Sequence, residues 1–346
     1  MEIIRRRAYA RAGLVGNPSD GYFGKTLSVI VRDYFAEVVL YEWEEIEVLL
    51  TDEDRNRFAT IDDLARDVKL HGYYGGIRLI KAAIHRFVEY CRQQETPLHD
   101  RKFSIRYRTN IPRAVGLAGS SAIVVATLRG LLAFYQVDMP LAVQASWVLG
   151  VENELGIAAG LQDRVIQVYE GLVFMDFAQE QMQTLNGFRV GQYQSMDPAL
   201  LPPLYLAYST TAGEPTEVFH NNLRARFEAG EPSVLAAMEG FAGLADEARE
   251  ALLRGDHAAF EQTLNANFDL RRRICQLPAD QIAMVETARS VGASAKFAGS
   301  GGAIVGVCAD PQKFQRLQHA MAQIDCLVWR PAIILEPPVE FDNRYD

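Results

Sequence analysis

The most constraining feature of this 346-residue chain is a segment, residues 120–135, that is apolar nearly all round. A helix of this composition has no polar face, which is typical of a helix buried on most sides. The chain as a whole is 49% hydrophobic and 23% charged, ordinary globular values that leave ample material for a core around such a helix.

A glycine-rich stretch leads directly into this helix. Gly116 and Gly119 allow the backbone to approach a ligand closely, and Ser120 and Ser121 stand where the helix begins. The first turn of a helix presents unpaired N–H groups and partial positive charge, which suit a phosphate. A serine there can cap the helix or bind Mg²⁺ through its hydroxyl. An ordinary capped core helix explains the glycines and serines equally well, so both interpretations stay open at this point.

Both halves of the chain mix strand and helix patterns without regular alternation, which predicts an α+β fold. Three prolines in residues 195–203 predict a boundary between an N-terminal domain, residues 1–195, and a C-terminal domain, residues 204–346. The predicted strands are residues 27–31, 36–41, 103–107, 172–177, 204–208, 303–307 and 327–335. The predicted helices are residues 77–90, 141–155, 216–229, 233–254, 257–276, 279–291 and 311–322, with further helices from Ser120 and after Asp163.

Charge and cysteine usage exclude several classes of protein. The net charge of −9 is unlike the basic surface of a nucleic-acid-binding protein. The four cysteines have no CxxC spacing, so neither a zinc site nor a disulfide framework is expected. There is no signal peptide and no apolar run long enough to span a membrane. We therefore expect a cytoplasmic protein, a monomer or homodimer, that binds neither nucleic acid nor membranes.

A second glycine-rich segment, residues 10–26, follows a strand near the N-terminus. Its end, Gly24-Lys-Thr26, imitates a P-loop, but Ser stands five positions before Gly24, where that motif needs glycine, and the next residues predict a strand. A plain β-turn is one interpretation of the segment. The other is a loop that holds a polar substrate through Asn17, Ser19 and Asp20.

Two further segments carry glycine or acidic residues in apolar surroundings. Residues 296–306 place three glycines in four positions before a strand, which fits either a tight hairpin or a loop that closes over a substrate. Residues 150–164 bring Glu152, Glu154 and Asp163 into an apolar stretch, where charged groups need a partner or a function. Capping of a helix is the alternative for Asp163.

Together and in this order, the segments resemble the superfamily of galactokinase, homoserine kinase, mevalonate kinase and phosphomevalonate kinase (GHMP kinases). Its Pro-x-x-x-Gly-Leu-Gly-Ser-Ser-Ala loop is matched by residues 112–122, with one extra residue before the serines. Arg11 and Asp20 match the arginine and aspartate of the galactokinase N-terminal motif, whereas Asn17 and Pro18 replace its Glu-His. Hexose recognition by those two positions therefore cannot be carried over. Glucuronokinases resemble the chain more closely, through residues 13–20, 72–78, 161–164, 267–273 and 296–302.

The resemblance implies a two-domain fold, with a ribosomal-S5-domain-2-like N-terminal domain and a ferredoxin-like C-terminal domain. It implies ATP and Mg²⁺ as cofactors, with Asp163 and Arg11 as catalytic residues and Mg²⁺ held by Ser121 and Glu154, or less favourably by Ser120 and Glu152. The residues expected to hold the nucleotide are Pro112, Gly116, Leu117, Ala118, Gly119, Ser120 and Ser121. Those expected to bind the substrate are Asn17, Ser19, Asp20, Arg164 and Gly301.

The implied reaction is transfer of the ATP γ-phosphoryl group to the anomeric hydroxyl of D-glucuronate. A sugar carboxylate calls for an arginine or lysine, and Arg164, Arg78 and the run 271–273 are open candidates. The alternatives are a kinase for another sugar or sugar acid, a catalytically inactive nucleotide-binding regulator, and a purely structural α+β protein.

Overall fold

The structure is a computed structural model that describes residues 3–49, 75–157, 159–210 and 217–334. Its larger sheet is built around one long strand, β2 (Lys25–Trp43), which the sequence predicts as two shorter strands. On one side β2 pairs along most of its length with β1 (Ile3–Val15), and on the other it pairs with β4 (Lys102–Thr109) and β5 (Leu172–Asp176), all antiparallel. The edges are β3 (Glu47–Val48) beside β4 and β8 (Gln192–Met196) beside β5.

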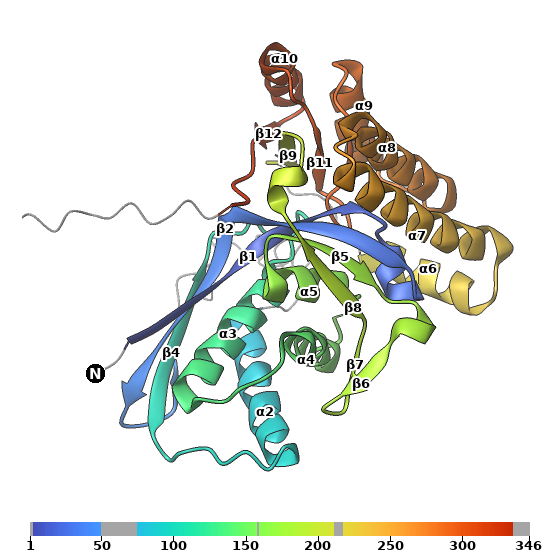
Figure 1. Cartoon of the computed structure of the whole chain (residues 1–346). Helices are drawn as coiled ribbons and strands as arrows, with labels where there is room; N and C mark the ends of the chain where they lie inside the picture. The colour runs from blue at the N-terminus through green and yellow to red at the C-terminus, as the bar shows by residue number, and fades with distance from the viewer. Residues whose placement is uncertain (1–2, 50–74, 158, 211–216, 335–346) are drawn as a thin grey trace, which may run out of the picture.

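Four helices cover one face of this sheet (Figure 1): α2 (Gly76–Gln93), α3 (Gly119–Tyr135), α4 (Leu141–Glu154) and α5 (Gln162–Tyr169). The central one is α3, the apolar segment of the sequence. It packs against β1 and β2 as well as against the other three helices, and its side chains at Ala122, Val124 and Leu128 are fully buried. The expectation of a helix buried on most sides is confirmed.

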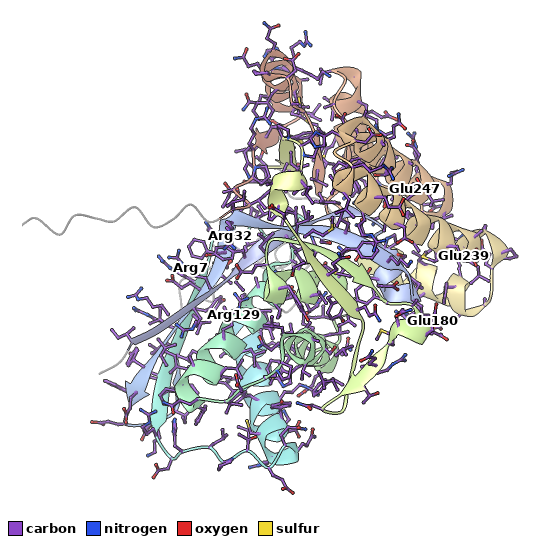
Figure 2. The ribbon with its side chains drawn as sticks, viewed as in Figure 1. Arg7, Arg32, Arg129, Glu180, Glu239 and Glu247 are labelled. Carbon is purple, nitrogen blue, oxygen red and sulfur yellow. The ribbon has the colours of Figure 1, made fainter. Side chains whose placement is uncertain are left out.

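The short helix α5 is held in place at its C-terminal end. Arg129 of α3 donates to the carbonyls of Gln167 and Val168, which lie in the last turn of the helix. Glu170, just beyond, forms ion pairs with Arg129 (2.9 Å) and Arg32 (2.6 Å), two of the residues labelled in Figure 2. These contacts fix the helix whose first turn carries Asp163.

The smaller sheet is antiparallel in the order β10-β11-β9-β12. Its strands are β9 (Leu204–Ser209), β10 (Lys296–Phe297), β11 (Ala303–Val307) and β12 (Cys326–Trp329). The helices of this half are α6 (Glu217–Glu228), α7 (Pro232–Leu253), α8 (His257–Ile274), α9 (Ala279–Ser290) and α10 (Pro311–Ala322). Helices α8 and α10 contact the smaller sheet, α9 packs on α10, and α6 packs on α7. A small hairpin, β6 (Gln183–Leu185) and β7 (Phe188–Val190), and strand β8 are elements that the sequence pattern missed.

The smaller sheet contributes to the apolar core of the larger one. Leu206 and Val305 of the smaller sheet belong to the same buried cluster as Leu27 of β2 and Val124 of α3. Helix α7 contacts β2, and α8 contacts β1, β10 and β11. The predicted α+β architecture is confirmed, while the domain boundary at residues 195–204 stays a prediction.

Parts of three predicted segments, residues 72–74, 216 and 335, lie outside the described residues. In the described part of the chain, no helix is both long and apolar enough to cross a membrane.

Candidate functional site

Arg11 belongs to the glycine-rich segment of residues 10–26, and its guanidinium joins that segment to the other three that the sequence singled out. Arg11 lies on β1 and is 4% exposed. Its Nε and Nη2 donate to the two carboxylate oxygens of Asp163 at 2.6 and 2.7 Å. Its Nη1 donates to the carbonyl of Gly116 at 2.6 Å and to that of Ala298 at 3.2 Å. The N-terminal strand, the glycine-rich loop before α3, the first turn of α5 and the C-terminal glycine segment therefore meet at one side chain.

Asp163 stands in the first turn of α5, where the positive end of the helix dipole favours a carboxylate. Its side chain is 21% exposed, and Arg164 lies 3.5 Å away on its other side. A carboxylate held by a bidentate arginine is fixed in direction. The carboxylate of Asp163 is held in this way and remains partly exposed.

Asp20 lies on the short helical turn η1 (Ser19–Tyr22) close to Asp163. Its Oδ2 accepts the backbone N–H of Gln162 at 3.2 Å, and a Cβ at Gly160 would overlap that oxygen, so Gly160 makes room for it. Burial and the charge of Asp163 raise the pKa of Asp20 from 3.8 to about 6, although the Gln162 bond and nearby arginines oppose the rise.

The loop before α3 turns sharply into the helix. Gly116 has φ +71° and Ala118, at the N-cap, has φ 63°, both in the left-handed region. Gly119 begins the helix, Pro112 is half-buried at the start of the loop, and Leu117 is buried in the core. This loop leads directly to the first-turn N–H groups of α3. The loop also lies close to Gly301, because a Cβ at Gly116 would lie 2.5 Å from the Gly301 carbonyl oxygen.

The structure pairs Ser120 with Glu152, and not Ser121 with Glu154. Ser120 Oγ donates to Glu152 Oε1 at 2.7 Å, whereas Ser121 Oγ donates to the Ala118 carbonyl at 3.2 Å. Glu154 is two residues beyond Glu152, about 200° further around α4, which is the opposite side of the helix. Its side chain is 39% exposed and lies near His85 and Arg86 of α2. This geometry corrects the expected pairing of Ser121 with Glu154.

Arg164 is committed to Glu152 inside the protein. Its Nε donates to Glu152 Oε2 at 2.6 Å, its Nη2 contacts the same oxygen, and its Nη1 donates to the Gly160 carbonyl at 3.0 Å. The two side chains are 4% and 0% exposed. The expected role of Arg164 in binding a substrate carboxylate therefore has no geometric support.

Asn17 and Ser19 also turn inward. Ser19 is fully buried and its Oγ donates to the Lys25 carbonyl at 3.0 Å. Asn17 Oδ1 accepts a hydrogen bond from Lys296 Nζ at 2.6 Å. Both residues shape the turn that carries Asp20. The P-loop interpretation fails here too, because Lys25 lies in strand β2 and pairs with Asp246 at 2.8 Å.

The C-terminal glycine segment packs backbone to backbone against the loop before α3. A Cβ at Gly299 would overlap the Gly116 carbonyl and lie 2.9 Å from both Nη atoms of Arg11. Arg271 of α8 donates to the carbonyls of Gly299 and Ser300 at 2.8 and 2.9 Å. The contact requires glycine on both sides.

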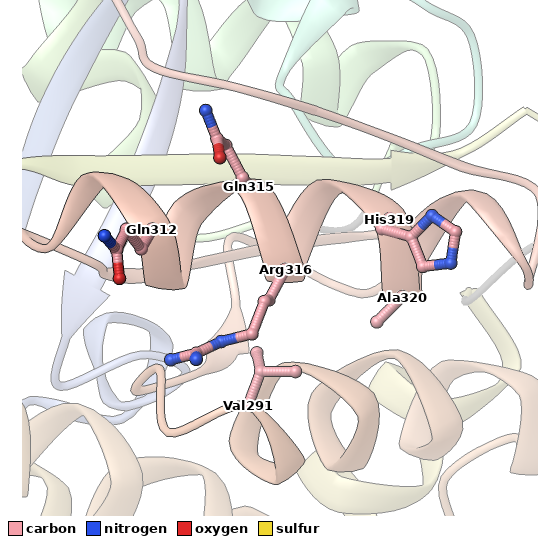
Figure 3. Close-up of a pocket in the computed structure, with 6 residues that line it drawn as sticks. All are labelled: Val291, Gln312, Gln315, Arg316, His319 and Ala320. Carbon is pink, nitrogen blue, oxygen red and sulfur yellow. The ribbon is translucent and has the colours of Figure 1, made fainter.

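The sequence pattern assigned no role to two residues of this region, Lys296 and Asn267. It left Arg271, which is buried, as one of several open candidates. A signal for the last two exists: positions 260, 264, 267, 268 and 271 form one face of α8 and are all buried, so Asn267 and Arg271 share the stripe of Phe260, Leu264 and Phe268. The surface hollow of Figure 3, between Val291 and Gln312, Arg316 and His319 of α10, contains none of the motif residues.

Comparison with known proteins gives two matches to family models. Residues 78–171 match the GHMP kinases N terminal domain, and residues 248–324 match the GHMP kinases C terminal model. Glucuronokinase 1 of Arabidopsis thaliana is 45% identical over 324 residues, which cover 91% of this chain and 88% of the relative. Probable glucuronokinase 2 of the same plant is 42% identical, with 92% and 88% covered.

Solved structures share the fold at low sequence identity. The mevalonate kinase of Methanococcus jannaschii superposes with a TM-score of 0.71 at 17% identity, covering 96% of this chain and 99% of that one. The galactokinase of Lactococcus lactis in complex with galactose gives 0.74 at 14% identity, covering 96% and 94%. The resemblance drawn from the glycine-rich segments is confirmed, as is the two-sheet fold it implied.

Proposed function

Because this chain belongs to the GHMP kinase family and is an ATP-dependent sugar kinase, we propose that it transfers the γ-phosphoryl group of ATP to the anomeric hydroxyl of D-glucuronate. The products are 1-phospho-D-glucuronate and ADP. The observation that carries the reaction type is the convergence of the glycine loop, Asp163 and the C-terminal glycine segment on Arg11. The identity with two proteins named as glucuronokinases supports the acceptor.

The nucleotide phosphates lie on the loop from Gly116 to Ser121, against the N-terminus of α3. Phosphoryl transfer needs little covalent help from the protein, so positioning and charge neutralisation dominate. Backbone N–H groups at a helix start supply fixed donors, and Gly116 lets the backbone come close to phosphate.

The residues at this end of α3 fit a bound Mg²⁺. Ser120 and Glu152 are both oxygen donors and already lie 2.7 Å apart. Magnesium prefers such ligands and keeps several waters, so two protein ligands suffice. When bound, the ion neutralises charge on the β- and γ-phosphates.

Asp163 orients the acceptor hydroxyl and takes up its proton as the new bond forms. Arg11 holds both carboxylate oxygens and so fixes the direction of the group, while its positive charge favours the ionised form. Because the transition state is loose, proton transfer comes late and orientation contributes most. Asp20, on η1 beside the first turn of α5, accepts hydrogen bonds from sugar hydroxyls in its ionised form.

The experiment is a screen of acceptors with ATP and Mg²⁺, read by ADP release. D-glucuronate, other uronic acids, neutral hexoses, L-arabinose and mevalonate are compared by kcat/KM. D-glucuronate is expected to be the best acceptor. A neutral hexose that surpasses it by orders of magnitude would refute the assignment of the substrate.

A further inference from the structure

Lys296 is a lysine buried in strand β10 beside the site. It is 1% exposed, and its ammonium group donates to three oxygens: the Gly13 carbonyl at 2.6 Å, Asn17 Oδ1 at 2.6 Å and the Phe297 carbonyl at 2.8 Å. A lysine has three N–H donors, so every donor is used. All three partners are neutral.

The charge of this lysine has no carboxylate beside it in the described part of the chain. The charged groups that face it are Arg271 from α8 and Arg11 from β1, and burial together with these two cations lowers its pKa well below the usual range. The three acceptors around Nζ favour the charged form, because only the ammonium group has three N–H donors. Arg271 donates to the carbonyls of Gly299 and Ser300, and Arg11 pairs with the carboxylate of Asp163. Buried charges are normally paired, because the solvation they lose must be replaced.

Lys296, which lies near the cations Arg271 and Arg11, contacts the backbone that leads to the turn carrying Asp20. Asn267 of α8 accepts the Gly16 N–H at 2.7 Å and donates to the Asn17 carbonyl at 3.1 Å. With Lys296 on Gly13 and Asn17, two side chains from the C-terminal half therefore hold the backbone of residues 13–17. That backbone leads into η1, where Asp20 lies.

We propose that Lys296 is a specificity-determining positioning residue. It holds the sugar-binding turn, and its positive charge, unmatched by any carboxylate of its own, makes the site select a sugar that carries a carboxylate. This inference rests on the proposed function of the site. Since its donors are all engaged, Lys296 acts through Asn17 and through its field and not by touching the sugar. An anionic sugar brings a negative charge to this group of cations, and a neutral sugar does not.

The sharpest test is Asn17→Asp. This change places a carboxylate where Asn17 Oδ1 already lies 2.6 Å from Lys296 Nζ, and so neutralises the lysine without altering the shape of the turn. The two acceptors compared are D-glucuronate and its neutral amide, D-glucuronamide, by kcat/KM or, where turnover is absent, by inhibition constants. Discrimination between them is expected to fall on the order of 50-fold, as for one unit charge acting over about 7 Å at the effective dielectric constant of about 20 found near a protein surface. KM for ATP should change less than about twofold.

Two control variants separate charge from positioning. Asn267→Ala removes two hydrogen bonds from the same turn without changing charge, so it should weaken both sugars alike and leave their ratio unchanged. Asn265→Asp makes the same chemical change on α8, at a side chain that accepts the Ala295 N–H, and should also preserve the ratio. If Asn17→Asp does not fold, Lys296→Met serves the same purpose, because it removes the charge and keeps an apolar chain of similar length.

Loss of discrimination in Asn17→Asp or Lys296→Met, but not in the two controls, supports the proposal. An unchanged ratio in both charge variants overturns it while the proposed function stands. Failure of the wild-type protein to phosphorylate D-glucuronate overturns the proposed function instead, so the two failures are distinct.

Discussion

Replacing Asp20 by Asn should stabilise the protein at neutral pH while weakening its activity. Burial and the charge of Asp163 raise the pKa of this carboxyl from 3.8 to about 6. The folded state therefore binds the proton more tightly than the unfolded state, and the stability this provides is present below about pH 4 and lost as pH rises to 6. About two pKa units correspond to about 3 kcal/mol.

Asparagine has the same shape, still accepts the Gln162 N–H and cannot ionise. Above pH 7 the ligand-free Asp20→Asn variant should therefore be more stable by up to about 3 kcal/mol, or about 4 °C in Tm for a chain of this length. At pH 4.5 the difference should shrink to about a third of that value, about 1 kcal/mol, because folded Asp20 is then still largely protonated. The same variant should lose sugar affinity, the common cost of removing a strained functional group.

The assay is thermal unfolding of the two proteins at several pH values between 4.5 and 8. Asp269→Asn is the matched control, because its carboxylate is 56% exposed and pairs with Arg289 at the surface. Its effect should stay within about 0.5 kcal/mol. A Tm difference for Asp20→Asn that is independent of pH, or a variant less stable than wild type at pH 8, would refute the reasoning.

Three further changes test the site. Asp163→Asn should lower kcat by at least about 100-fold while thermal stabilisation by Mg-ATP persists; near wild-type turnover would contradict its role. Glu152→Gln removes the closer counter-charge of the buried Arg164 and leaves Asp163 at 3.5 Å, so it should cost about 3 kcal/mol in urea unfolding, whereas equal stability would show that the pair is dispensable. Gly299→Ala places a methyl group against the Gly116 carbonyl and should raise KM for ATP about 10-fold; an unchanged KM would mean that the two loops can separate freely.

The parts of the site that lie in glycine-rich segments could be predicted from the sequence. Glycine patterns mark places where a backbone must approach closely, and this is where the structure brings Gly116 and Gly299 together. The apolar pattern after Ser120 likewise predicts a helix that is buried on most sides, as the structure shows. Arg11 and Asp163 are 152 residues apart in the chain, and their contact followed from the family resemblance and not from any local pattern.

The rotational phase of α4 could not be predicted in the same way. Apolar residues such as Ala142, Val143 and Val148 lie on several sides of this helix, so its periodicity does not say whether Glu152 or Glu154 faces the loop. Tertiary packing decides, and it selects Glu152.

Lys296 illustrates a second limit. Its role depends on carbonyls of residues 13 and 17, nearly 280 positions earlier, and a single lysine before a glycine loop carries no sign of that distant contact. Strand β8 was missed for a related reason: Gln192–Met196 lacks apolar alternation and owes its place to pairing with β5.

The most direct measurement is ³¹P NMR of the product formed from ATP, Mg²⁺ and D-glucuronate by the purified protein. The account predicts ADP and, in equal amount, a sugar phosphate whose phosphorus couples to the anomeric proton. A phosphate ester at another carbon, or no phosphate transfer above that of the Asp163→Asn variant, would contradict it.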